Sequence, residues 1–494
     1  MYRNLFKDLD LWLNSSNRLP LVLQGARQVG KTWLMKEFTR TRFKKVVYLN
    51  FDADEMAKEI FSTDYFIPRI IRELEAIKQV QILPQETAII FDEIQECPRA
   101  LTALKYFAED ASHYAVLAAG SLLGVTSAAK GTGFPVGKVQ TLRLFPLTFC
   151  EFLRARGKET LADMLESGVI SASLGRYCTS ELKNYFFVGG MPQVVAEFGQ
   201  SMNYLGARKI QEELLWAYEQ DFAKHVSARE LPRLRMIWQS IPEQLAKEQR
   251  KFVWGALRDG ARAKDFEIAL QWLEDAGLVH QVHTISKPDV PLTAYRQSFF
   301  KLFHLDIGLL GALGGLTPEA IVGECRIFEE FKGAMTEQFV CQQMIAQGIH
   351  PFTWSMPNGR GEVDFIFQNG AEVIPVEVKA AENLRSRSLM AFVARFHSSR
   401  AIRTSLSPAR TDWLEIKNGE GNTAETIRYR FENIPLWAIE NQAMKKVMQD
   451  IPSNMTEEIP NAETRTAIQE ARLIAEDPTV PGHDVEEALK ELKR

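Results

Sequence analysis

The fold of the N-terminal part of the chain is decided by the stretch Leu21-Val22-Leu23-Gln24-Gly25-Ala26-Arg27-Gln28-Val29-Gly30-Lys31-Thr32. Its first three residues are apolar and predict a buried strand, and residues 33–38 predict a helix. Between them lies the pattern GxxxxGK[ST], in the strand–loop–helix setting that it requires. Gly25 and Gly30 permit backbone angles that turn successive N–H groups inward, and the helix directs its positive end to the same place. We therefore predict a phosphate-binding loop, or P-loop, at residues 25–32.

An apolar strand that ends in two acids predicts the second part of a nucleotide site. It runs over residues 87–91 and ends in Asp92 and Glu93. Carboxylates at the C-terminal end of such a strand lie beside the P-loop, because doubly wound sheets bind ligands at that edge. The cofactors expected here are ATP and Mg²⁺, with Asp92 holding the ion and Glu93 orienting the attacking water. A strand-end turn with two solvated acids is the plain alternative.

Within the P-loop, Lys31 is expected to neutralise β- and γ-phosphate oxygens, and the Thr32 hydroxyl to bind Mg²⁺. Further strands are predicted at residues 45–50 and 114–120, the second ending at Gly120-Ser121. A strand between the two nucleotide motifs and a polar residue at a neighbouring strand tip resemble the arrangement of AAA+ ATPases. The resemblance implies that Ser121 touches the γ-phosphate, whereas the alternative is an ordinary Gly-Ser turn. GTPases are disfavoured, since no NKxD motif occurs.

A more specific resemblance comes from three strings: Phe134 to Val139 (FPVGKV), Leu144 to Leu153 (LFPLTFCEFL) and Val188 to Pro192 (VGGMP). Together they resemble a prokaryotic AAA-type ATPase family whose C-terminal domain is of unknown function and has a nuclease-like core. The resemblance extends from about residue 15 to about residue 435. Many relatives have Gly-Arg where this chain has Gly137-Lys138, so the arginine finger is not identified here.

The expected fold class is α/β multidomain, with a P-loop AAA-type parallel sheet. The expected domains are the ATPase domain (1–155), a helical lid (156–221), a winged-helix-like domain (222–312), a nuclease-like domain (313–440), and a linker with a helical tail (441–494). The winged helix rests on apolar positions at helical spacing over residues 263–276, followed by strands at 278–282 and 300–305. Such modules bind DNA or proteins, and both readings stay open. Basic residues precede or open it, namely Arg250, Lys251, Arg258, Arg262 and Lys264.

The C-terminal part contains a charge pattern that resembles the PD-(D/E)XK nuclease core. The resemblance implies that Asp364 and Glu377 hold a divalent ion from adjacent strands, that Lys379 positions the attacking water, and that Glu337 supports the ion from a helix. The alternatives are a degenerate core without cleavage, or a hairpin with a polar exposed face. DNA is a candidate partner, because basic residues gather here: Lys379, Arg385, Arg387, Arg395, Arg400, Arg403 and Arg410.

The tail carries a second, short resemblance. The string IPNAETRTAIQEARLIAEDP, from Ile459 to Pro478, is similar to the C-terminal part of RelB-type antitoxins. It implies a RelE-like toxin as a partner, and the alternative is a docking helix pair.

Composition bounds the remaining expectations. The chain has 494 residues and a net charge of −4, so nucleic-acid binding would need a local basic patch. The five cysteines form no CxxC pair, which argues against a zinc ribbon or a disulfide framework and favours a cytoplasmic location. No transmembrane segment or signal peptide is expected, hence no membrane partner, while a homo-oligomer remains open. The leading hypothesis is an ATP-hydrolysing protein coupled to a nuclease-like domain. The alternative is a nucleotide-controlled interaction scaffold, linked to a toxin–antitoxin or defence system.

Overall fold

The structure, a computed structural model, describes residues 1–120, 134–168, 172–247, 251–322, 329–356, 361–379, 386–418 and 425–440. Residues 1–445 form one compact unit and residues 446–494 a second one. The antitoxin-like string of the second unit lies outside the described residues, as do Ser121, Arg250 and Arg385. In the described parts of the chain, no helix has the length and apolarity needed to cross a membrane.

The N-terminal part contains a five-stranded parallel sheet in the order β2-β3-β4-β1-β5. Its strands are β1 (Leu21–Gln24), β2 (Lys45–Asn50), β3 (Thr87–Asp92), β4 (Ala115–Ala119) and β5 (Gln140–Arg143). The first four confirm the strands predicted from the sequence. Strand β4 separates the P-loop strand β1 from the carboxylate strand β3, whereas β2 lies at the edge. Both nucleotide motifs therefore lie at the C-terminal ends of strands in one sheet.

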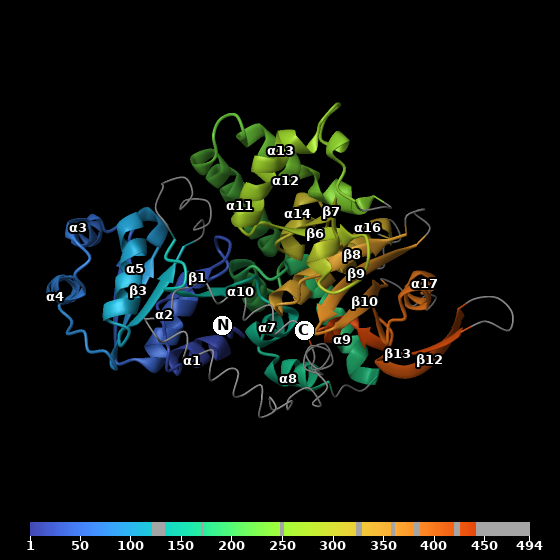
Figure 1. The fold of residues 1–494 in the computed structure, drawn as a ribbon, viewed down its shortest axis with the longest axis horizontal. Coiled ribbons are helices and arrows are strands. Elements are labelled where there is room, and N and C mark those ends of the chain that lie inside the picture. Colours follow the sequence, from blue (N-terminus) through green and yellow to red (C-terminus); the bar gives the residue numbers. More distant parts are fainter. Residues whose placement is uncertain are drawn as a thin grey trace, which may run out of the picture. The chain divides into compact units, whose positions relative to one another are not determined.

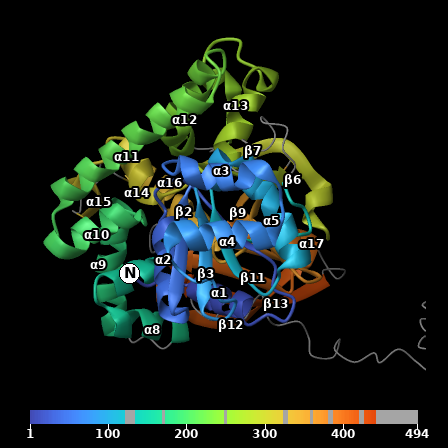
Figure 2. The ribbon, with the colours of Figure 1, turned by 90° about the vertical axis from the view of Figure 1, so that its left-hand side faces the viewer.

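Helices cover both faces of this sheet (Figures 1 and 2). They are α1 (Phe6–Leu13), α2 (Lys31–Arg42), α3 (Glu55–Thr63), α4 (Ile67–Lys78) and α5 (Pro98–Asp110), with the short 3₁₀ helix η1 (Ile94–Glu96). On one face, residues of α3, α4 and α5 form a buried core with alternate strand residues such as Val22 and Phe91. Buried residues of α2, including Leu34 and Phe38, belong to the remaining core. This alternation follows from the period of two in a strand.

Helices dominate the next part of the chain. They are α7 (Phe149–Ala155), α8 (Glu159–Ser167), α9 (Ala172–Val188), α10 (Pro192–Ser201), α11 (Tyr204–His225), α12 (Leu231–Ala246) and α13 (Ala263–Asp275), with η2 (Trp254–Ala256). Helix α7 begins with a capping box, in which Thr148 and Glu151 satisfy each other's backbone N–H groups. Helix α13 ends before Gly277, whose φ of +71° fits the left-handed position that follows many helices.

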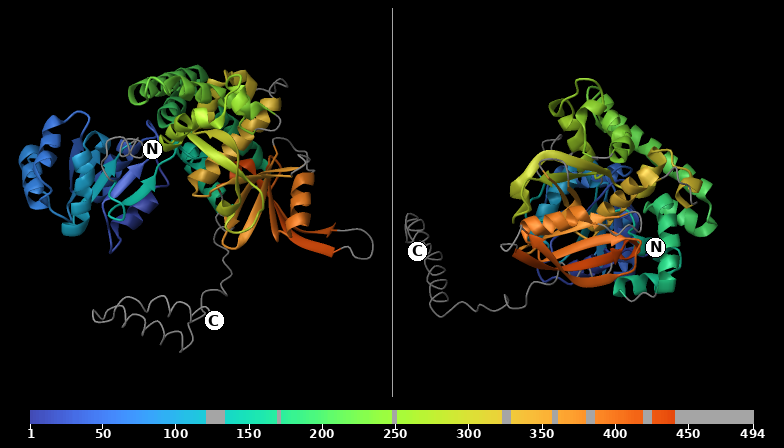
Figure 3. Two further views of the ribbon diagram at one scale, coloured as in Figure 1. Left: turned by 45° about the horizontal axis from the view of Figure 1, so that its top comes forward. Right: turned by 90° about the vertical axis from the view of Figure 1, so that its right-hand side faces the viewer.

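The C-terminal part contains an eight-stranded mixed sheet in the order β12-β13-β11-β10-β9-β8-β6-β7 (Figure 3). Its strands are β6 (Val279–Ile285), β7 (Arg296–His304), β8 (Phe352–Ser355), β9 (Glu362–Asn369), β10 (Glu372–Val378), β11 (Arg400–Ser405), β12 (Arg410–Asn418) and β13 (Glu425–Pro435). The two strands expected as a wing, β6 and β7, form one edge of this sheet. Strands on both sides of the expected boundary at 312/313 thus share one sheet.

The helices of this part are α14 (Ile307–Leu313), α15 (Pro318–Val322), α16 (Glu329–Ala346) and α17 (Arg387–Phe396), with η3 (Leu292–Tyr295) and η6 (Leu436–Ala438). Helix α17 packs its apolar residues onto the sheet. Phe392 joins a cluster with Trp354 and Val363, and Leu389 joins a second one with Tyr429. Helix α16 carries several buried polar side chains, including Glu337, Gln338 and Gln343, so it packs through polar contacts as well.

Candidate functional site

The backbone of the P-loop has the conformation that its glycines permit. Gly25 has φ +143° and Gly30 has φ +96°, both outside the range of most side chains. A Cβ atom at Gly25 would lie 2.3 Å from the carbonyl oxygen of Leu144, so close packing also excludes a side chain there. Gln28, at φ +67°, is a left-handed non-glycine residue that the sequence pattern did not reveal. The loop before α2 therefore contains three residues with positive φ, namely Gly25, Gln28 and Gly30.

Lys31 is the first residue of α2 and has 8% of its surface exposed. Its Nζ donates hydrogen bonds to the carbonyl oxygens of Gly25 and Ala26, at 2.9 and 2.8 Å. Burial lowers the pKa of Lys31 to about 8, and the negative charges of Glu93 and Asp92 act against this shift. The two sequence motifs, about sixty residues apart, therefore lie close enough for their charges to interact.

Asp92 and Glu93 are held in different ways at the end of β3. Asp92 is 4% exposed and accepts a hydrogen bond from the Tyr48 hydroxyl, at 2.7 Å. Glu93 is half-buried, has a left-handed backbone (φ +51°), and accepts a 2.5 Å hydrogen bond from the Gln95 side-chain amide. A non-glycine residue held there marks a local strain that is common at functional sites.

Tyr48 and Gln95 are site residues that sequence reasoning missed. Tyr48 lies on the neighbouring strand β2, in register with Ile90 of β3. Burial and the hydrogen bond to Asp92 raise the pKa of Tyr48. The available signal was Tyr48 inside the predicted strand 45–50, but the strand order was needed to place it beside Asp92.

The residues present fit a Mg²⁺ ion. Asp92 and Thr32 supply oxygen donors, and Thr32 is the second residue of α2, beside Lys31. Mg²⁺ in nucleotide sites keeps several waters and binds few protein groups besides phosphate oxygens. The described residues contain no group of three or more His, Cys, Asp or Glu that could hold a metal by itself. That finding is compatible with a site that the nucleotide completes.

Elements from beyond the P-loop domain also contact the loop. Arg27 forms an ion pair with Asp221 of α11, and the Tyr218 hydroxyl donates to the Arg27 carbonyl at 2.7 Å. A Cβ at Gly277 would lie 3.4 Å from the backbone nitrogen of Ala26. A Cβ at Gly30 would lie 3.6 Å from a ring carbon of Pro192. Helices α10 and α11 and the turn after α13 therefore pack directly on the nucleotide loop.

Lys138, at the position where the family resemblance implied an arginine in many members, forms an ion pair with Glu109 of α5, at 2.9 Å. Gly137 before it has φ +73°, with nothing within 4 Å of a Cβ at that position. The lysine is thus engaged within its own domain, and the structure adds no support for a finger role.

On the second sheet, β9 and β10 bring Asp364 and Glu377 together. The antiparallel register pairs Val376 with Phe365, which puts the two carboxylates opposite each other on one face. Burial raises the pKa of Glu377 to about 7, with a further contribution from the charge of Asp364 and an opposing one from Lys379. The Lys379 ammonium lies 2.5 Å from Glu377 Oε1, and Asp364 accepts a 2.7 Å hydrogen bond from the Val378 N–H.

Glu337 does not join this pair in a three-carboxylate group. Its carboxylate lies 3.1 Å from the ammonium of Lys301 on β7, which also contacts Glu362 of β9 at 2.6 Å. Lys301 and Glu337 are each 2% exposed. A buried lysine therefore lies between two acids where the resemblance implied that Glu337 supports a metal ion.

The basic residues of this part are mostly engaged by neighbouring groups. Arg400 contacts Glu432 at 2.9 Å, Arg403 donates to the Asn433 side chain, and Arg410 contacts Asp412. Arg387 and Arg395, both on α17, are exposed. Arg410 is exposed as well, although it is paired with Asp412. Among the described members of the expected basic footprint, Arg387, Arg395 and Arg410 are therefore the exposed arginines.

Three family models match separate parts of the chain. Residues 17–153 match the model described as "AAA domain". This segment contains the loop at residues 25–32 and the five-stranded parallel sheet. Residues 179–320 match "Domain of unknown function (DUF8612)", and residues 332–424 match "Domain of unknown function (DUF4143)". The second match covers residues from both the expected lid and the expected winged helix. No curated protein matches the chain.

Solved structures resemble the chain at low identity. The Walker-type ATPase PABY2304 of Pyrococcus abyssi is 14% identical, with a TM-score of 0.42, over 63% of this chain and 94% of that one. The ORC2 protein of Aeropyrum pernix, in ADPNP–ADP complexes, is 15% identical, with a TM-score of 0.33, over 67% and 92%. CDC6P from Pyrobaculum aerophilum is 12% identical, with a TM-score of 0.25, over 68% and 93%.

Proposed function

We propose that the chain binds ATP at the P-loop and hydrolyses it with the help of Glu93. One observation carries the proposal: Lys31 lies buried in the loop, and its ammonium interacts with the charges of Asp92 and Glu93. A buried cation beside two carboxylates at the C-terminal edge of a parallel sheet is the arrangement that a Mg²⁺-nucleotide needs.

In this proposal each side chain has one task. The backbone N–H groups of residues 25–32 and the Lys31 ammonium hold the phosphates. Thr32 and Asp92 would hold Mg²⁺, which supplies charge neutralisation at the phosphate oxygens. Glu93 orients and polarises the water that attacks the γ-phosphate, and the Gln95 amide fixes its carboxylate. The Tyr48 hydroxyl restrains the Asp92 carboxylate through its hydrogen bond.

Three variants separate binding from hydrolysis. Lys31→Ala and Asp92→Ala should lose ATP binding, whereas Glu93→Gln should bind ATP and hydrolyse it poorly. ATP at roughly 1,000 times its dissociation constant should stabilise the wild type by about 4 kcal/mol, which a thermal shift detects. Lys44→Ala, which removes an exposed lysine of the same domain, is the control and should behave as the wild type. The same ATP-induced shift in Lys31→Ala would exclude the assigned site.

A second candidate function is metal-dependent cleavage of nucleic acid at Asp364, Glu377 and Lys379. It is favoured by two carboxylates facing each other on adjacent strands, one with its pKa raised to about 7. Such a pair is stabilised by a cation, and either a metal ion or Lys379 can supply it.

The two cases differ in measurable ways. If a metal binds, calorimetry with Mn²⁺ should show uptake that Asp364→Asn abolishes, and nicking of DNA should require Lys379. Glu372→Gln, which changes an exposed acid on the neighbouring strand β10, is the matched control. No uptake and no nicking by the wild type would leave the scaffold alternative. In that case DNA binding, if present, would depend on Arg387 and Arg395 and weaken steeply with salt.

A further inference from the structure

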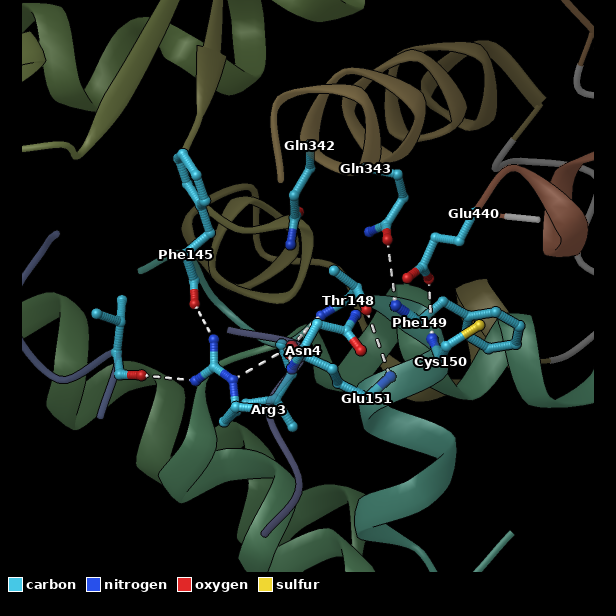
Figure 4. A network of polar contacts seen from close by, with 12 residues as sticks. Arg3, Asn4, Phe145, Thr148, Phe149, Cys150, Glu151, Gln342, Gln343 and Glu440 are labelled. Atoms are coloured by element: carbon cyan, nitrogen blue, oxygen red, sulfur yellow. Dashed lines mark hydrogen bonds and ion pairs between the residues drawn. The ribbon is translucent and has the colours of Figure 1, made fainter. Parts of the chain in front are cut away.

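A buried arginine far from the P-loop in sequence holds the backbone of the loop. Arg3 precedes α1 and is 3% exposed. Its Nη1 donates a hydrogen bond to the Val29 carbonyl at 2.9 Å, and its Nη2 donates to the Phe145 carbonyl. Its Nε lies 3.2 Å from Oε2 of Glu151, forming an ion pair (Figure 4). The guanidinium thus connects the P-loop, the segment after β5, and helix α7.

The carboxylate that pairs with Arg3 is itself fixed. Glu151 is 3% exposed and accepts hydrogen bonds from the backbone N–H groups of Asn4, at 2.5 Å, and Thr148, at 3.0 Å. It belongs to the capping box of α7. A planar guanidinium anchored on one edge by a fixed carboxylate presents its remaining N–H groups in defined directions. Arg3 therefore fixes the position of the two carbonyl oxygens, rather than following them.

The Val29 carbonyl matters because of the peptide plane that it shares with Gly30. In a trans peptide the C=O and the following N–H point in opposite directions. A donor that holds the Val29 oxygen on one side therefore directs the Gly30 N–H to the other. That N–H belongs to the row of loop amides expected to receive phosphate oxygens. Gly30 has φ +96°, a conformation that needs support from its surroundings.

The same segment also holds the beginning of the loop. The carbonyl oxygen of Leu144, next to Phe145, lies 2.3 Å from the position that a Cβ of Gly25 would take, and the Leu144 N–H donates to the Gln24 carbonyl at 2.8 Å. Fixing Phe145 through Arg3 therefore restrains Gly25 and Gly30 together.

We propose that Arg3 is a positioning residue for the nucleotide site, which sets the orientation of the Val29–Gly30 peptide for phosphate binding. The proposal rests on the proposed ATP function and adds a residue 22 positions upstream of Gly25, whose Nη donors bind the carbonyls of Val29 and Phe145.

The decisive variant is Arg3→Lys, compared with Arg3→Ala. A lysine keeps the charge beside Glu151 but loses the fixed fork that reaches two carbonyls. We expect its dissociation constant for ATP and its KM to rise about tenfold, the effect of losing one charge-assisted hydrogen bond, while kcat at saturating ATP changes less than twofold. Arg3→Ala should weaken ATP binding at least as much. Melting temperatures without nucleotide report whether each variant is folded.

Arg18→Ala is the matched control. Arg18 also donates to two backbone carbonyls in the same part of the chain, those of Leu13 at 3.1 Å and His113 at 2.9 Å. Its loss should leave ATP affinity unchanged. Wild-type affinity and KM in Arg3→Lys would overturn the proposal, as would an equal loss in Arg18→Ala. If the wild type binds ATP and Lys31→Ala does not, the proposed function stands even when Arg3 fails. Absence of ATP binding by the wild type would overturn both.

Discussion

Lys31 carries an ammonium group that the fold largely removes from water. Burial lowers its pKa from 10.5 to about 8. Between pH 8 and pH 10.5 the unfolded chain therefore binds more protons at this position than the folded chain does. The free energy of unfolding gains a contribution that rises with pH across this window and is lowest below pH 8. The nucleotide site thus reduces the stability of the free protein at neutral pH, as a site prepared for an anion should.

The variant Lys31→Met tests whether burial of the protonated Lys31 lowers the free energy of unfolding. Methionine cannot be protonated, so its stability relative to the wild type should be highest near pH 7 and should decline by up to about 3 kcal/mol as the pH rises to 10.5. Denaturant unfolding at several pH values measures the difference, with the exposed lysine in Lys44→Met as control. A relative stability of Lys31→Met that does not vary with pH would contradict the prediction.

Helix α7 has seven residues, and other elements supply much of its N-terminal capping (Figure 4). The Phe149 N–H donates to Gln343 of α16 at 3.2 Å, and the Cys150 N–H donates to Glu440 at 2.9 Å. First-turn N–H groups have no partner within their own helix, so these long-range acceptors satisfy them. The helix that positions Arg3 through Glu151 is thereby joined to the C-terminal part of the unit.

Glu440 makes the contact between α7 and the C-terminal part of the unit depend on pH. Burial raises its pKa from 4.5 to about 7. The folded chain then binds more protons than the unfolded one, so the stabilisation is fully present below pH 4.5 and lost as the pH rises through 7. Glu440→Gln keeps a neutral acceptor, so its stability relative to the wild type should increase by up to about 3 kcal/mol between pH 5 and pH 7.5. Melting curves across this range measure the change.

Glu86→Gln is the control for that experiment. Glu86 is half-buried, and its hydrogen bond with Lys44 lowers its pKa, so its titration lies below the tested range. Its stability relative to the wild type should therefore stay constant between pH 5 and pH 7.5. A parallel trend in both variants would show that Glu440 is not the group responsible.

At the scale of the whole molecule, the parts of the first unit depend on one another. Strand β6 pairs with β8 in parallel, through Thr284 with Thr353 and Ile285 with Trp354. Strand β8 comes after residue 320, and so do the caps of α7 at Gln343 and Glu440. A chain cut at 320 loses these partners and exposes the edge of β6.

We therefore expect a chain ending at residue 445 to fold and to keep ATPase activity, because it contains the complete first unit. A chain ending at 320 should aggregate or melt without a cooperative transition. Solubility, melting and ATP turnover of the two truncations measure this. A soluble, cooperatively melting 1–320 chain would show that the second sheet is not needed for folding of the rest.

The 1–445 chain also tests the antitoxin-like tail. A RelE-like toxin should be captured by the full-length chain and not by the truncated one. Equal recovery with both would remove the tail as its binding segment.

The sequence alone predicted the P-loop, the carboxylate strand and the first four of the five strands of the N-terminal sheet. Their signals are local, since glycines with left-handed backbone, an apolar run and a helix start lie within a few residues of one another. The resemblance to a nuclease core also implied that Asp364 and Glu377 lie on adjacent strands, as they do on β9 and β10. These features follow from the local backbone preferences of the residues, which do not depend on the tertiary contacts that the segment later makes.

Only the tertiary structure decided which side chains meet. It brought together the hydrogen-bonded pairs Tyr48–Asp92 and Arg3–Val29, the ion pair Lys301–Glu337, and the paired strands β6 and β8. Each contact joins residues that are 26 or more positions apart in the sequence. Such pairs leave no periodic pattern, because they depend on the order of strands and on the packing of helices rather than on local preference. Burial then sets the free energy of these contacts. A charged side chain is well solvated in water, but once it is buried it must be compensated by a partner of opposite charge or by hydrogen bonds.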